Sequence, residues 1–175
     1  TSPAMDILIS SNVERVLFDK YGPKRTKELM DELKENKFYK LSSNELKELQ
    51  KDFSAVYSDD DFARETIKEF ANDGYIMDPH TATCLKAYTE LKEKNIPSIL
   101  CSTAEWTKFA PTMLNALKKD TIKYSDKEAL KGISESLHVK IPQCISSLFE
   151  KKVLHDKVVN RKDIENEILN FIKEK

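Results

Sequence analysis

The sequence has few glycines and no excess of either charge, and each shortage excludes a class of site. Its 175 residues include only three glycines, at positions 22, 74 and 132. A loop that wraps a phosphate group needs several glycines close together, so no glycine-rich phosphate loop lies in this sequence. The net charge is -1. Nucleic-acid binding needs a basic excess or patch, so we expect no nucleic-acid partner.

Cysteines and long apolar runs are also scarce. The three cysteines, at positions 84, 101 and 144, are odd in number and widely spaced. This spacing indicates neither a disulfide framework nor a pair of metal ligands, so we expect no metal site and a reducing, cytoplasmic compartment. Cys84 and Cys101 stand among apolar residues, where we expect them to be buried. No apolar run approaches the roughly 20 residues of a membrane span, and we expect no membrane association.

Apolar periodicity and capping residues predict a chain made mainly of helices. One helix follows Ser10–Asn12 and ends near Gly22, and Pro23 starts another. Whether Ser10–Asn12 begins that helix, or interrupts one that starts at Ser2–Pro3, stays open. Ser42 and Glu45 fit a capping box, and Asp78 with Pro79 fits a helix start. Further helices are predicted from Ser58 or Asp59, from Pro111, around Ala129–Leu137, and over Pro142–Phe149 and Asp163–Ile172.

Only about two strands are predicted. Residues 96–101 contain a short apolar run between breakers, and residues 53–58 alternate apolar with polar side chains. Two strands are fewer than a typical sheet contains. Either they complete a sheet whose other strands are missing, or the core is mainly helical. Because Met5 is internal as well, we expect residues 1–175 to be one unit of a longer protein, with a helical tail over 121–175.

Ser102 and Thr103 directly follow the predicted strand 96–101. In open α/β sheets ligands sit beyond the carboxyl ends of the strands, so these two hydroxyls stand where chemistry is usually found. The alternative is that they only cap the next helix. Ser102 lacks the flanking glycines of a nucleophile elbow, which argues against a hydrolase.

Three further groups of polar residues are candidates for binding. Ser11, Asn12 and Arg15 share a helix start and suit an anion site, or else form a cap with a surface Glu14/Arg15 pair. His80 lies in the first turn of a helix, where the dipole favours a neutral imidazole that can bind a ligand; the alternative is a partly exposed helix-start histidine. Lys108 can bind phosphate as a point charge, or be an ordinary surface lysine.

Three blocks together resemble the C-terminal part of threonine synthase. They read SPAMDILISSNVERVLFD, GYIMDPHTATCLKAY and CSTAEWTKFAP, in this order, and the resemblance covers Ser2–Leu117. It implies the helix-rich C-terminal part of an α/β fold of the tryptophan synthase β type. It also implies a pyridoxal-phosphate enzyme that converts O-phospho-L-homoserine and water to L-threonine and phosphate.

The same resemblance implies roles for the candidate residues. Thr103, beside Ser102, matches the hydroxyl residue that faces the pyridine nitrogen of the cofactor, and a neutral hydroxyl there leaves the nitrogen largely unprotonated. Ser11, Asn12 and Arg15 match a segment near the phosphate or carboxylate of the substrate. His80 and Lys108 lie in the matching blocks as further substrate-binding candidates.

The sequence departs from the family in two ways. Glu105-Trp106 stands where the family has His or a small residue before Lys-Phe, so the wall facing the substrate differs. The Schiff-base lysine and the phosphate loop of the family precede this region, so we expect no catalytic residue here and no turnover by this chain alone. The alternatives are a non-catalytic helical interaction domain, or another pyridoxal-phosphate lyase that keeps Thr103 without the SSN-x-ER block. The oligomeric state stays open.

Overall fold

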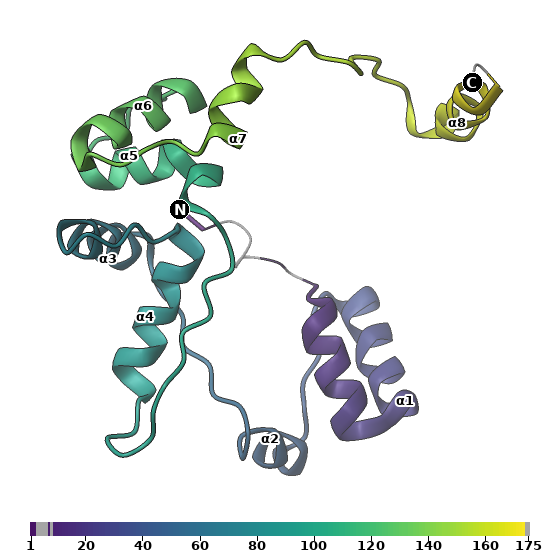
Figure 1. Ribbon diagram of the computed structural model, residues 1–175. Coiled ribbons are helices and arrows are strands. Elements are labelled where there is room, and N and C mark those ends of the chain that lie inside the picture. Colours follow the sequence, from purple (N-terminus) through teal and green to yellow (C-terminus); the bar gives the residue numbers. More distant parts are fainter. Residues whose placement is uncertain (3–6, 8, 174–175) are drawn as a thin grey trace. The chain divides into compact units, whose positions relative to one another are not determined.

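The computed structural model describes residues 1–2, 7 and 9–173, and these residues form helices joined by extended segments (Figure 1). They divide into two compact units, Thr1–Lys140 and Ile141–Lys175. The possible helix start at Ser2–Pro3 falls largely outside the described residues. No helix of the described part is long and apolar enough to cross a membrane.

No strand forms among the described residues, so the prediction of about two strands is wrong for this chain. Residues 53–58 and 97–101 have no regular secondary structure. Most of their apolar side chains are open to solvent, and Ile99 is 89% exposed. A strand is stabilised by backbone hydrogen bonds to a neighbouring strand, and no described residue supplies such a strand to these segments. The predicted burial of Cys101 is wrong for the same reason, whereas Cys84 is half-buried.

Helix α1 (Ser11–Asn36) folds back on itself at Gly22 (Figure 1). The Ser10 side chain caps it by accepting a hydrogen bond from the Val13 backbone N–H at 3.4 Å, so Ser10–Asn12 begins a helix. Gly22 has φ 76°, which a residue without Cβ adopts readily, and the helix resumes at Pro23. The predicted stop and restart are therefore confirmed. The two arms bury Leu17 and Leu29.

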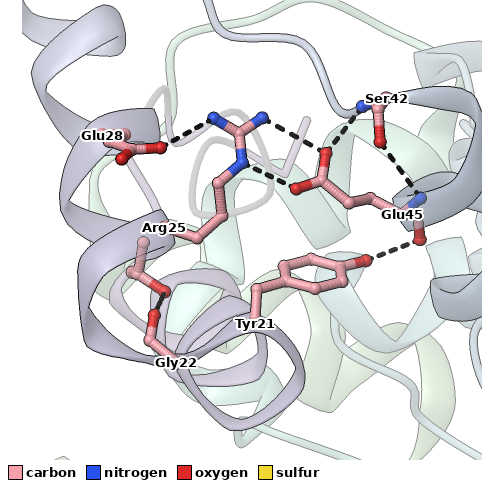
Figure 2. A network of polar contacts seen from close by, with 7 residues as sticks. Tyr21, Gly22, Arg25, Glu28, Ser42 and Glu45 are labelled. Carbon is pink, nitrogen blue, oxygen red and sulfur yellow. Dashed lines mark hydrogen bonds and ion pairs between the residues drawn. The ribbon is translucent and has the colours of Figure 1, made fainter.

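Helix α2 (Ser43–Leu49) is tied to α1 by a network of polar contacts around Glu45 (Figure 2). The predicted capping box is present, with the Ser42 N–H donating to Glu45 Oε2 at 2.7 Å. Arg25 donates to both carboxylate oxygens, from Nε at 2.6 Å and from Nη2 at 3.2 Å. The Tyr21 hydroxyl donates to the Glu45 carbonyl at 2.7 Å. Glu45 therefore caps its own helix and holds it to α1.

This network predicts that the stability of the fold falls at acidic pH. The Arg25 guanidinium, helped by the Ser42 N–H, lowers the pKa of Glu45 from 4.5 to about 2. Because the pKa is lower in the folded protein, Glu45 stabilises the fold above about pH 4.5, and this contribution is lost as pH falls towards about 2. We expect the stability advantage of the wild type over Glu45→Gln to shrink across this window in urea unfolding. Glu48→Gln, an exposed change on the same helix, is the control; an advantage independent of pH would contradict the assignment.

Four helices form the core of the first unit. Helices α3 (Asp60–Asn72), α4 (Pro79–Leu91), α5 (Ala110–Lys118) and α6 (Asp126–Leu137) pack in the pairs α3 with α4, α3 with α5, and α5 with α6. A short 3-10 helix, η2 (Trp106–Phe109), leads into α5. Buried side chains from these helices include Ile67, Leu85, Leu114 and Ile133. Gly132 makes room for Leu114, since a Cβ there would lie 2.9 Å from its Cδ2. The core is therefore helix on helix.

The second unit contains α7 (Gln143–Ser146), η3 (Ser147–Glu150), η4 (Arg161–Asp163) and α8 (Ile164–Lys173). These helices match the two predicted over Pro142–Phe149 and Asp163–Ile172. None of their described residues is buried. Helix α8 is amphipathic, and Ile168 and Phe171 are both more than half exposed. The described residues of this unit therefore form no apolar core of their own.

Candidate functional site

The candidate site is built around the start of helix α4, which Asp78 caps. Its Oδ1 accepts the backbone N–H of His80 at 3.0 Å and that of Thr81 at 3.3 Å, and its Oδ2 accepts the Thr81 hydroxyl. Pro79 occupies the first helical position, where its missing N–H costs nothing. The predicted helix start is therefore confirmed. Asp78 is 1% exposed, so these donors satisfy a buried carboxylate.

His80 is buried beside this cap. It is 4% exposed, and its Nδ1 lies 3.3 Å from Asp78 Oδ1. Its ring centre is 4.4 Å from that of Phe109, with the planes tilted by 51°. Lys108 stands next to Phe109, with its Nζ 5.3 Å from the ring centre. Asp78 and Phe109 thus fix the position of the imidazole, which differs from the partly exposed histidine considered as the alternative.

Ser102 is joined to the same cap through Thr81. The two hydroxyl oxygens, Thr81 Oγ1 and Ser102 Oγ, lie 3.3 Å apart, although the residues are 21 positions apart in the sequence. Ser102 and Thr103 are exposed, and no strand precedes them. The structure therefore brings Ser102 and His80 to one place, at the N-terminal end of α4.

Ser11, Asn12 and Arg15 lie in the first turns of α1 and are all exposed. Among the described residues, no ion pair involves Arg15, so the Glu14/Arg15 pair considered as an alternative does not form. No hydrogen bond of the described part joins these three residues to Ser102, Thr103 or Lys108. Thr103 is not buried as a cap either, so the geometry leaves the binding role of these residues a prediction.

Burial and the nearby carboxylate also act on Cys84, one turn along α4. Burial raises the pKa of its thiol, and the charge of Asp78 raises it further. Since the thiolate is the nucleophile, Cys84 is a poor candidate for covalent chemistry. Within the part of the chain that the structure describes, no group of three or more potential metal ligands occurs.

Sequence reasoning missed Thr81 and Phe109, which join the separate blocks. The signal for Thr81 was present, because a hydroxyl residue three positions after an N-cap lies within reach of the capping side chain. No pattern pointed to the contact of Phe109 with His80, since it depends on how η2 packs. Trp106, one of the departures from the family, is 9% exposed and begins η2, so it packs into the protein.

Comparison with known proteins finds relatives named threonine synthase or threonine synthase-like 1, although no family model matches. Human threonine synthase-like 1 is 36% identical over 121 residues, 67% of this chain and 16% of that protein. The threonine synthase of Saccharomyces cerevisiae is 35% identical over 136 residues, 66% of this chain and 26% of the enzyme. That of Pseudomonas aeruginosa is 36% identical over 112 residues, 62% of this chain and 24% of the enzyme.

Two solved structures share the fold of almost the whole chain. Pyridoxal-phosphate-bound threonine synthase from Brucella melitensis superposes with a TM-score of 0.75 at 28% identity, covering 97% of this chain and 33% of that one. Yeast threonine synthase gives a TM-score of 0.73 at 30% identity, covering 99% and 35%. This chain thus spans about a third of the length of these structures. The resemblance seen in the three sequence blocks is confirmed: the chain is a homologue of the threonine synthases and has the fold of part of their structure.

Proposed function

We propose that this chain is the C-terminal portion of a cytoplasmic threonine synthase, which converts O-phospho-L-homoserine and water to L-threonine and phosphate with pyridoxal phosphate as cofactor. The observation that carries the proposal is the match of 97% of the chain to a pyridoxal-phosphate-bound threonine synthase. The contact between Thr81 and Ser102 also supports the proposal, because it joins two of the three sequence blocks that carry the resemblance.

The hydroxyls of Ser102 and Thr103 fit one side of the cofactor. Both are exposed, and a neutral hydroxyl suits a pyridine nitrogen that stays largely unprotonated. The phosphate group of the cofactor finds no matching glycine loop in this chain, because Gly22 and Gly74 lie in turns and Gly132 makes room for a neighbouring helix. When bound, pyridoxal phosphate supplies an electron sink for chemistry at the substrate carbons. This chain therefore provides contacts to the ring, and the rest of the protein holds the phosphate.

Ser11, Asn12 and Arg15 are proposed to bind the phosphate or carboxylate of the substrate. They lie at the N-terminal end of α1, where free N–H groups and the helix dipole favour an anion. The guanidinium of Arg15 adds charge-assisted, bidentate hydrogen bonds to such a group. His80 and Lys108 are proposed to serve the substrate side of the Ser102–Thr103 segment, Lys108 as an exposed cation and His80 as a buried imidazole, each in contact with the ring of Phe109.

The chain is proposed to be inactive by itself, because none of its lysines stands in the sequence context of the Schiff-base lysine. Lys108, the lysine of the third block, lies over the ring of Phe109. The competing proposal, a non-catalytic interaction domain, draws on the exposed apolar side chains of α8. The remainder of a larger enzyme would also cover them, which makes the assay below the deciding test.

The test is an assay of the native gene product purified from its own cells. With O-phospho-L-homoserine and pyridoxal phosphate, we expect equal amounts of phosphate and L-threonine to appear, and the 175-residue chain alone to release neither. The Thr103→Val variant of the native product should lose at least about tenfold in cofactor affinity, because the ring nitrogen loses its hydrogen-bond partner. Threonine formation by the chain alone, or none by the native product, would refute the proposal.

A further inference from the structure

We propose that Thr81 is a positioning residue: it accepts a hydrogen bond from Ser102 and so holds in place the segment that carries Thr103, the residue already proposed to face the pyridine nitrogen of the cofactor. The inference builds on the proposed function, since it divides the roles of two residues assigned to one cofactor.

The Thr81 hydroxyl carries a single proton, and Asp78 takes it. A carboxylate only accepts hydrogen bonds, and Asp78 Oδ2 accepts this one while Oδ1 accepts two backbone N–H groups. Thr81 Oγ1 then has only lone pairs left to offer to Ser102 Oγ, 3.3 Å away. Ser102 must therefore be the donor of the hydrogen bond between them.

This direction separates the roles of Ser102 and Thr103. Once the proton of Ser102 is directed at Thr81, its oxygen presents only lone pairs, which cannot bind an unprotonated ring nitrogen. Thr103 is exposed, and no hydrogen bond to another described residue takes its proton. Of the two neighbouring hydroxyls, only that of Thr103 is available to donate.

The hydrogen bond also holds a segment that has little else to fix it. No backbone hydrogen bond between described residues involves residues 97–104. Thr81 is 3% exposed and Asp78 1%, so the other end of the chain of hydrogen bonds is anchored in the core. Through Thr81, the buried cap of α4 therefore sets the position of Ser102, and so of Thr103.

The experiment uses the full-length protein that contains this chain, and its first readout needs no cofactor. Hydrogen–deuterium exchange of the peptide covering residues 99–106 is compared in cofactor-free protein. We expect faster exchange in Thr81→Val and in Ser102→Ala, and wild-type exchange in Thr81→Ser, which restores the hydroxyl. Thr83→Val is the matched control, because the Thr83 hydroxyl donates at 2.7 Å to the carbonyl of His80 in its own helix.

The second readout is the affinity for pyridoxal phosphate, followed by its absorbance. Thr81→Val and Ser102→Ala should each weaken binding by about tenfold, and the double variant should bind no more weakly than either, because both remove one interaction. Thr103→Val should weaken binding without changing the exchange of residues 99–106, since its role is direct contact.

Unchanged exchange in Ser102→Ala, or additive losses of affinity in the double variant, would overturn the inference. Ser102 is exposed, so its variant gives a result even if Thr81→Val fails to fold. If exchange rises as expected but the wild-type protein binds no pyridoxal phosphate, Thr81 still positions the segment, and the proposed function and the Thr103 contact fail.

Discussion

Replacing Asp78 by alanine is expected to lower the free energy of unfolding by about 3 kcal/mol. The change removes the acceptor of three hydrogen bonds, from the N–H groups of His80 and Thr81 and from the Thr81 hydroxyl. The site is 1% exposed, so water cannot replace the lost acceptor without opening the end of α4. Urea unfolding followed by the helical circular dichroism signal measures the loss.

Asp59 provides a matched control, because it is also an aspartate N-cap. It accepts the Phe62 N–H at 2.8 Å at the start of α3, but it is exposed. Asp59→Ala should therefore cost only about 1 kcal/mol, the usual value for an exposed cap. Equal losses in the two variants would show that burial and the Thr81 hydroxyl add nothing at Asp78.

Replacing Arg15 by alanine in the native gene product is expected to raise KM for O-phospho-L-homoserine about thirtyfold, with kcat nearly unchanged. A charge-assisted hydrogen bond contributes about 2 kcal/mol, which corresponds to this factor. A group that binds substrate and transition state equally changes KM and leaves kcat alone. Steady-state phosphate release measures both constants.

Lys24→Ala is the control for this experiment, since Lys24 is an exposed cation on the second arm of α1. It should leave KM within about twofold of the wild type, because an exposed charge without a specific contact contributes little. If both variants raise KM equally, the effect of Arg15 is the general charge of α1. If neither does, the proposed anion site at the N-terminal end of α1 is wrong.

Helix starts were predictable because their signals are local. Ser10, Ser42 and Asp78 each cap a helix with a side chain that reaches only two or three residues along the chain. The break at Gly22 was predictable for the same reason, since a glycine followed by a proline favours the end of one helical arm and the start of the next. The structure gives Gly22 a φ of 76° at this break. These features need no knowledge of distant residues.

Strands were not predictable in this way, because a strand depends on its neighbour. The apolar run with Ile99 and Leu100 has the composition of a buried strand, yet these side chains are 89% and 40% exposed. The pattern carries no information on whether the partner strand lies in the same chain. It stays a prediction that these residues complete a sheet whose other strands lie outside this chain.

Residues of the candidate site were predictable from the sequence, but the contacts between them were not. His80, Ser102 and Thr103 were selected from their blocks, but the contact through Thr81 that joins two blocks spans 21 residues. The burial of His80 depends on the packing of Phe109, from a different helix. Such contacts follow from tertiary packing and leave no periodic signal in the sequence.

The most direct test of the account is the intact mass of the native gene product, taken from its own cells by mass spectrometry. The chain has a mass of 20.2 kDa and covers 33% of the Brucella melitensis structure. We expect a product of more than about twice the mass of this chain, because the proposed enzyme needs a Schiff-base lysine and a phosphate loop, and the proposal places both in the remainder of the polypeptide. A product of 20.2 kDa would contradict the account, since no such remainder would then exist.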